Sequence, residues 1–170
     1  FRAVGAAASR ALRVAVWVVL GVAAGFGCAA FLRRPDFTSD FEMVWRAARL
    51  LVDGVNPYGF VEYNGERIYG GQPQLYPLTT LWLVSLVAWL PVHAAGGILF
   101  GTGTAALSYA ITRDGFWRLH FLMSGPFLVA LSLGQFVPFI MVAALLPAWG
   151  VLALLKPSIG LGAPAGHPSL

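Results

Sequence analysis

The feature that most constrains this chain is a set of apolar runs too long for a soluble fold. Residues 14–32 form 19 consecutive uncharged residues. A helix of that length, at about 1.5 Å per residue, covers close to the roughly 30 Å hydrocarbon core of a bilayer. Only 11% of the chain is charged and 58% is hydrophobic, whereas soluble chains are about one quarter charged. The sequence therefore predicts a polytopic membrane protein.

The runs predict an all-α integral membrane protein with about five transmembrane or re-entrant helices. Residues 119–155 lack a formally charged side chain, and Gly134-Gln135 with Pro138 should break this stretch in two. The tail, residues 160–170, completes no element and predicts a fragment of a longer protein. We expect one membrane domain with spans at about 14–32, 75–92, 94–112, 119–134 and 137–155.

Charge placement predicts the orientation. Three arginines and no acid precede the first run, whereas residues 33–74 carry five basic and six acidic residues. The positive-inside rule then places the N-terminus in the cytoplasm and the loop 33–74 outside. A signal peptide is the competing interpretation, but the run is long and Arg33 and Arg34 follow it. Strict alternation of five spans puts residues 113–118 outside, which the same rule disfavours.

The outer loop holds six of the seven acids. Ser39 followed by Glu42 three residues later is a capping box, and the apolar residues behind it recur at helical spacing. This pattern predicts an amphipathic helix over residues 39–52, lying at the outer interface. Asn64-Gly65 between two short β-prone segments predicts a tight hairpin.

Several function classes lose support. The net charge of +4 is spread over several loops, without the basic run that a nucleic-acid groove needs. His93 and His120 have no second ligand at metal spacing, so we expect no metal site. No phosphate loop or dinucleotide fingerprint appears, and no cofactor is expected. Cys28 is the single cysteine and excludes an internal disulfide.

Four patches occur in a familiar order. They are Asp40-Phe41 with Trp45 and Ala47-Ala48-Arg49, then Asn56-Pro57-Tyr58 and Tyr76-Pro77, then Leu133-Gly134-Gln135, and finally Lys156-Pro157 with Gly160-Leu161. Together they resemble glycosyltransferase family 87, integral-membrane mannosyltransferase-like enzymes of the C-type fold that use polyprenyl-phosphate sugars. The chain is far shorter than a whole enzyme of this type and resembles an N-terminal fragment. The missing helices imply that this segment alone is inactive.

The resemblance implies that an acceptor hydroxyl attacks the anomeric carbon of a polyprenyl-phosphate sugar on the outer face, with inversion. The family's loop aspartate corresponds to Asp40, which would act as general base. The alternative for Asp40 is an anion stabilised by the helix dipole. Asp36, also followed by Phe, lacks the trailing Trp and Ala-Ala-Arg pattern.

Four further residues are candidates for substrate binding. Lys156, the only lysine, would neutralise the phosphate or else snorkel from a helix end. Gln135, at a helix break, needs hydrogen-bond partners and serves either a structural bridge or a ligand. Tyr58 and Tyr76 offer rings to a sugar, although aromatics near a bilayer are commonly interface anchors.

The expected partners are a polyprenyl-phosphate sugar donor, a lipid or glycan acceptor, and membrane lipids. Ten arginines against one lysine are typical of a GC-rich bacterial genome, and the expected location is the bacterial plasma membrane. The alternative function is a non-catalytic membrane subunit or a transporter component whose outer loop binds a partner. A coupled carrier would normally have ionisable residues within its spans, and the predicted spans have almost none.

Overall fold

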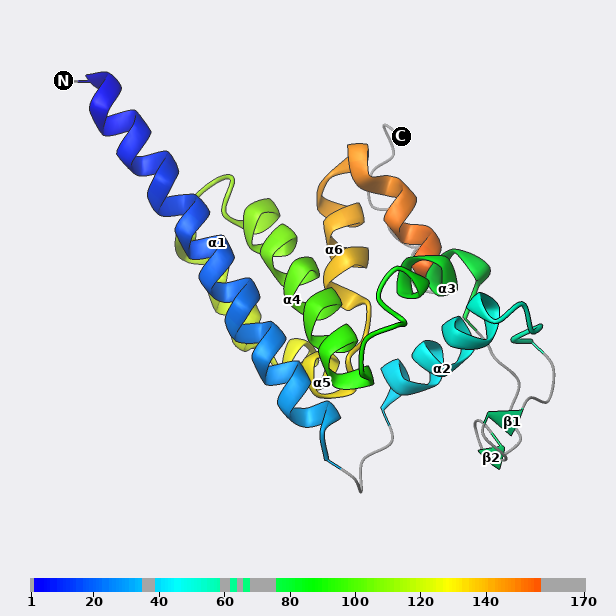
Figure 1. The fold of residues 1–170 in the computed structure, drawn as a ribbon. Helices are drawn as coiled ribbons and strands as arrows, with labels where there is room; N and C mark the ends of the chain where they lie inside the picture. The colour runs from blue at the N-terminus through cyan, green and yellow to red at the C-terminus, as the bar shows by residue number, and fades with distance from the viewer. Residues whose placement is uncertain (1, 35–38, 59–61, 64–65, 68–75, 157–170) are drawn as a thin grey trace.

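The computed structural model describes residues 2–34, 39–58, 62–63, 66–67 and 76–156, and these residues are predominantly helical (Figure 1). Two helical segments, Arg10–Leu32 and Val92–Ile111, are long and apolar enough to cross a membrane. The bent pair Phe116–Met123 and Gly125–Leu133, with an angle of 60°, raises the number to three if the pair is one span. The described residues thus form a helical protein suited to a membrane, with fewer spans than the five expected.

The two long helices, α1 (Arg2–Leu32) and α4 (Val92–Ile111), pack side by side in antiparallel directions (Figure 1). Glycines let their backbones approach closely. A Cβ atom on Gly25 would lie 2.7 Å from the carbonyl oxygen of Gly97, and one on Gly101 would lie 2.7 Å from that of Gly21. Small residues of this kind are typical of helix contacts within membranes, where close packing replaces the hydrophobic effect.

The antiparallel packing corrects the expected position of residues 113–118. The Arg13 guanidinium lies over the ring of Phe116, 5.7 Å from its centroid, and Trp17 Nε1 donates a hydrogen bond to Thr112 Oγ1 at 2.8 Å. The loop that follows α4 therefore lies at the same end as the N-terminal half of α1. The alternation argument was wrong because it counted residues 75–92 as a complete span.

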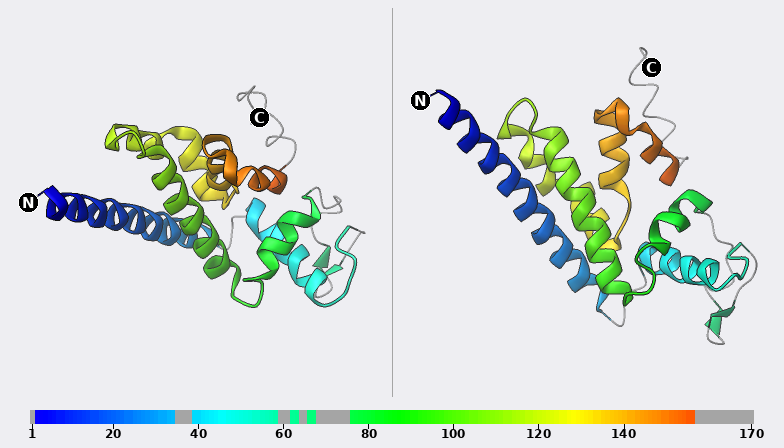
Figure 2. Two further views of the ribbon diagram at one scale, coloured as in Figure 1. Left: turned by 90° about the horizontal axis from the view of Figure 1, so that it is seen from above. Right: turned by 45° about the horizontal axis from the view of Figure 1, so that its top comes forward.

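Helix α3 (Leu78–Ser85) has only 8 residues, about 12 Å at 1.5 Å per residue, which is too short to cross a bilayer. After Ser85 the chain continues through three-residue turns, such as Val87 N–H to Val84 O, until Pro91 precedes α4. Continuous apolar sequence does not distinguish a span from a short helix followed by turns. Because α3 turns back, α2 and α3 lie at one end of α1 and α4 (Figure 2).

Helix α2 (Asp40–Val52) confirms the predicted capped helix. The Ser39 hydroxyl accepts a hydrogen bond from the Glu42 backbone N–H at 3.1 Å, and the Glu42 carboxylate accepts from Arg46 at 2.7 Å. The apolar face of α2 was expected to lie at the outer membrane interface, but it packs inside the protein. It is buried against α3 and α4 through side chains that include Phe41 and Val44.

The remaining elements complete the described fold. A 3₁₀ helix, η2 (Phe116–Met123), leads into α5 (Gly125–Leu133), and α6 (Val137–Leu145) leads into a second 3₁₀ helix, η3 (Pro147–Leu155). Helix α5 packs on α1, and α6 packs on α4 and η3. Strands β1 (Glu62–Tyr63) and β2 (Glu66–Arg67) pair antiparallel where the hairpin was expected. The expected tail at 160–170 lies outside the described residues.

The close contact of α1 and α4 predicts a specific sensitivity to added methyl groups. In Gly25→Ala the new Cβ meets backbone, which has little freedom to move, so overpacking should lower the free energy of unfolding by about 1–3 kcal/mol. The measurement is unfolding of the purified protein in detergent micelles. Gly125→Ala is the matched control because its Cβ would meet nothing within 4 Å. Equal stability of the two variants would contradict the backbone contact.

Candidate functional site

Asp40 is the first residue of α2. Two glycines fix the position of Asp40 by packing against its neighbour Phe41. A Cβ on Gly96 of α4 would lie 2.9 Å from Phe41 Cδ1, and a Cβ on Gly134 would lie 2.7 Å from Phe41 Cβ. The phenyl ring therefore occupies the space that these glycines leave, and it is buried. With Phe41 held, the half-buried Asp40 carboxylate is directed toward the junction of α5 and α6.

Gln135 reaches Asp40 from that junction. Helix α5 ends at Gly134, whose φ of 66° is left-handed, and the Gln135 N–H donates to the Ala130 carbonyl oxygen at 2.9 Å. This glycine-terminated helix end turns the chain sharply before α6 begins. It places Gln135 Nε2 2.6 Å from Asp40 Oδ2, a hydrogen bond between residues 95 positions apart. The break predicted at Gly134-Gln135 is where the structure has it.

Tyr76 lies close enough to Asp40 to feel the charge of its carboxylate. Its ring packs edge-on against Phe136, with 6.1 Å between centroids, and Phe136 in turn contacts Phe41. Burial, and secondly the negative charge of Asp40, raise the pKa of Tyr76 to about 12. Both effects disfavour the phenolate. The Tyr76 hydroxyl, already protonated at neutral pH with its ordinary pKa of 10, therefore loses its proton less readily still.

Lys156, which follows η3, is held over the Tyr76 ring. The hydroxyl of Thr79 donates to the Leu154 carbonyl oxygen at 2.8 Å, and the hydroxyl of Thr80 donates to that of Leu155. These two bonds attach the end of η3 to the first turn of α3. They leave Lys156 Nζ 5.4 Å from the centroid of the Tyr76 ring, within the range of a cation–π contact.

Asp40, Tyr76, Gln135 and Lys156 therefore form one half-buried group, here called the Asp40 cluster. It combines a carboxylate, an amide that orients the carboxylate, a protonated phenol and an ammonium. Within the part of the chain that the structure describes, Asp40 Oδ1 accepts no hydrogen bond. An incoming hydroxyl can therefore donate to Oδ1, while the ammonium offers donors to an anionic group.

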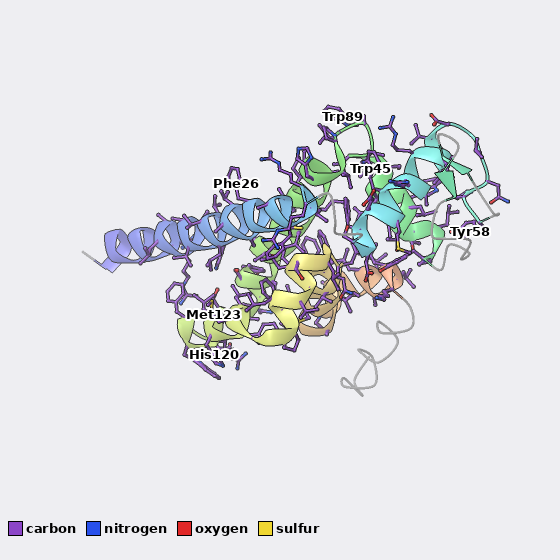
Figure 3. All side chains as sticks on the ribbon, turned by 90° about the horizontal axis from the view of Figure 1, so that it is seen from below. Phe26, Trp45, Tyr58, Trp89, His120 and Met123 are labelled. Carbon is purple, nitrogen blue, oxygen red and sulfur yellow. The ribbon has the colours of Figure 1, made fainter. Side chains whose placement is uncertain are left out.

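Tyr58 is the one candidate that the structure does not bring to the cluster. It follows the C-terminal end of α2, where its backbone N–H donates to Asn56 Oδ1 at 3.0 Å, and its side chain is exposed. Figure 3 shows it on the side of the molecule away from α1. A sugar contact by Tyr58 stays a prediction.

Sequence reasoning missed the residues that position the cluster. Thr79 and Thr80 were read as part of an apolar span, although two adjacent hydroxyls in such a run need acceptors and so signal a fixed contact. Phe136 was not singled out, yet it bridges the rings of Phe41 and Tyr76. Trp45 Nε1 also donates to the Leu90 carbonyl oxygen at 3.1 Å and thereby ties α2 to the start of α4.

No group of three His, Cys, Asp or Glu side chains that would suit a metal ion occurs among the described residues. Comparison of the chain with protein-family models, with curated proteins and with solved structures gave no match in any of the three. The indications of function are therefore the chemistry of the Asp40 cluster and the order of motifs in the sequence.

The pKa of Tyr76 provides a test of the cluster that needs no substrate. Asp40→Asn removes the charge that disfavours the phenolate, so the pKa of Tyr76 should fall below about 12 while staying above its ordinary 10, because burial is the larger cause. Tyrosine absorbance is measured as a function of pH in each protein and in its Tyr76→Phe derivative. The difference between the two curves gives the titration of Tyr76 alone. Asp53→Asn, at the other end of α2, should leave this pKa unchanged. An equal effect of both substitutions would contradict the contact.

Proposed function

We propose that this protein transfers a sugar from a polyprenyl-phosphate donor to a lipid or glycan hydroxyl, with Asp40 as general base. The observation that carries the proposal is the meeting of Asp40, Gln135 and Lys156, from three distant parts of the sequence, around Tyr76. Each of these residues lies in one of the four sequence patches that resemble glycosyltransferase family 87. The sugar is expected to be mannose-like, as in the family that the motifs resemble.

The proposed reaction assigns one role to each member of the cluster. The acceptor oxygen forms a bond to the anomeric carbon as the bond from that carbon to the phosphate oxygen breaks, with inversion. Asp40 Oδ1 takes the acceptor's proton, and the hydrogen bond from Gln135 to Oδ2 holds the carboxylate in orientation. The leaving phosphate gains negative charge, which Lys156 neutralises. The Tyr76 ring, which stays uncharged, holds the Lys156 ammonium beside the site.

The position of the cluster suits a lipid-linked donor. Asp40 begins α2 a few residues after α1 ends at Leu32, and α4 begins at Val92 at the same end. The reactive groups therefore lie near the end of the long apolar helices, which supports a donor whose phosphate is held at the membrane surface. We propose that this end is extracytoplasmic in a bacterial plasma membrane.

The orientation is tested by thiol labelling. The opposite end gathers Arg10, Arg13, Arg113 and Arg118 with one described acid, whereas the arginines near the Asp40 cluster are interspersed with acids; this excess of basic residues favours the cytoplasmic side. On a Cys28→Ala background, Asp53→Cys should react with a membrane-impermeant reagent in intact cells. Asp114→Cys should react only after permeabilisation. The reverse pattern would place the Asp40 cluster in the cytoplasm and remove this part of the proposal.

The catalytic role of Asp40 is tested by Asp40→Asn in the full-length protein. The amide keeps the size of the side chain but does not take the acceptor's proton. General-base catalysis typically contributes about 10²- to 10⁴-fold, so sugar transfer from a polyprenyl-phosphate donor should fall within that range while expression and donor binding persist.

Two controls separate the possible bases. Asp53→Asn changes an exposed acid at the far end of the same helix and should keep full activity. Asp36→Asn changes the alternative aspartate, which lies outside the described residues. Loss in Asp36→Asn alone would move the base to Asp36. Full activity in Asp36→Asn and Asp40→Asn would favour the partner-binding subunit or transporter component instead.

A further inference from the structure

A groove runs along the contact between α1 and α4, on the face that no other described element covers. Its volume is about 560 Å³, within the range of sites that hold small molecules. Val22, Phe26 and Ala29 of α1 line one wall, and Ala94, Ile98 and Thr102 of α4 line the other. The Thr102 hydroxyl donates to its own helix at the Ile98 carbonyl oxygen, so it adds little polarity to the wall.

The groove and the Asp40 cluster lie on different faces of the helix pair. Gly27 of α1 faces Leu131 of α5, and Gln135 lies just after the end of α5. Phe26, in contrast, is 74% exposed and projects from α1 away from α5 (Figure 3). None of the four cluster residues lines the groove. Its occupant is therefore separate from the sugar donor of the proposed reaction.

The groove is apolar along its length and basic at one end. Arg33 follows the last residue of α1, and His93 is the second residue of α4, and both line the end of the groove at the level where the apolar helices finish. The first turn of α4 has no side-chain cap, so its positive dipole end also faces this region. Among the residues that the structure describes, no Asp or Glu lines the groove.

We propose that this groove binds an acidic phospholipid of the surrounding leaflet. The acyl chains lie along the wall from Phe26 toward Val18, and the phosphate meets the Arg33 guanidinium and the His93 ring. A guanidinium suits phosphate because its donors match two oxygens at once. A zwitterionic headgroup would bring a second cation beside Arg33, and no acid of the described lining could pair with that cation, which favours an acidic lipid.

The test measures the lipid selectivity of the full chain reconstituted in phosphatidylcholine vesicles. Electron paramagnetic resonance compares the motionally restricted fractions of spin-labelled phosphatidylglycerol and spin-labelled phosphatidylcholine. We expect a preference for phosphatidylglycerol. Arg33→Gln should reduce this preference about fivefold, the effect of roughly 1 kcal/mol per basic residue near a membrane surface. Arg34→Gln is the matched control because Arg34 lies over the Phe31 ring and does not line the groove.

A second pair of variants leaves charge unchanged. Ala94→Phe fills the groove beside His93 and should also reduce the preference, whereas Val19→Phe, on an exposed part of α1 outside the groove, should not. The proposal is overturned if the wild-type protein shows no preference. It is equally overturned if Arg33→Gln and Arg34→Gln reduce the preference for phosphatidylglycerol by the same amount while Ala94→Phe leaves it unchanged. A third outcome that overturns it is dimerisation through this face with exclusion of both labelled lipids.

Discussion

The close approach of α1 and α4 is the constraint on which the rest of the fold depends. Gly21 and Gly25 face Gly97 and Gly101 so closely that an added Cβ on these residues would contact the opposing helix within 3 Å. Because the helices are antiparallel, the end of α1 and the start of α4 meet at one level. Phe41 then enters the space beside Gly96, and Asp40 is placed next to it. A wider separation of the two helices would remove the support beneath the Asp40 carboxylate.

The Asp40 cluster concentrates charged and polar groups in a half-buried place. Its carboxylate, amide, phenol and ammonium are half-buried, which strengthens their interactions relative to exposed groups. Each polar group has a defined contact: Gln135 with Asp40, Lys156 with Tyr76, and the threonines of α3 with the end of η3. Pre-positioned groups of this kind need little reorganisation when charge develops on a substrate.

Local sequence signals predicted local structure well. Ser39 and Glu42 predicted the start of α2, and the glycine at 134 predicted the break before Gln135, because capping and left-handed turns depend on a few neighbouring residues. The number of spans was overestimated, because an apolar run at 75–92 has the same composition whether it crosses a bilayer or turns back. The meeting of Asp40 with Gln135 depends on packing between elements 95 residues apart, and no spacing rule reports such a contact.

Asp40 and Lys156 are proposed to act on one substrate in one site, and a double-mutant cycle measures whether they do. Sugar transfer from a polyprenyl-phosphate donor is measured for the wild-type full-length protein, Asp40→Asn, Lys156→Met and the double variant. Residues that act as a unit are strongly non-additive. If the two residues act as a unit, the double variant should lose little more activity than the more impaired of the two single variants. Losses that multiply, as expected of independent sites, would contradict the proposal.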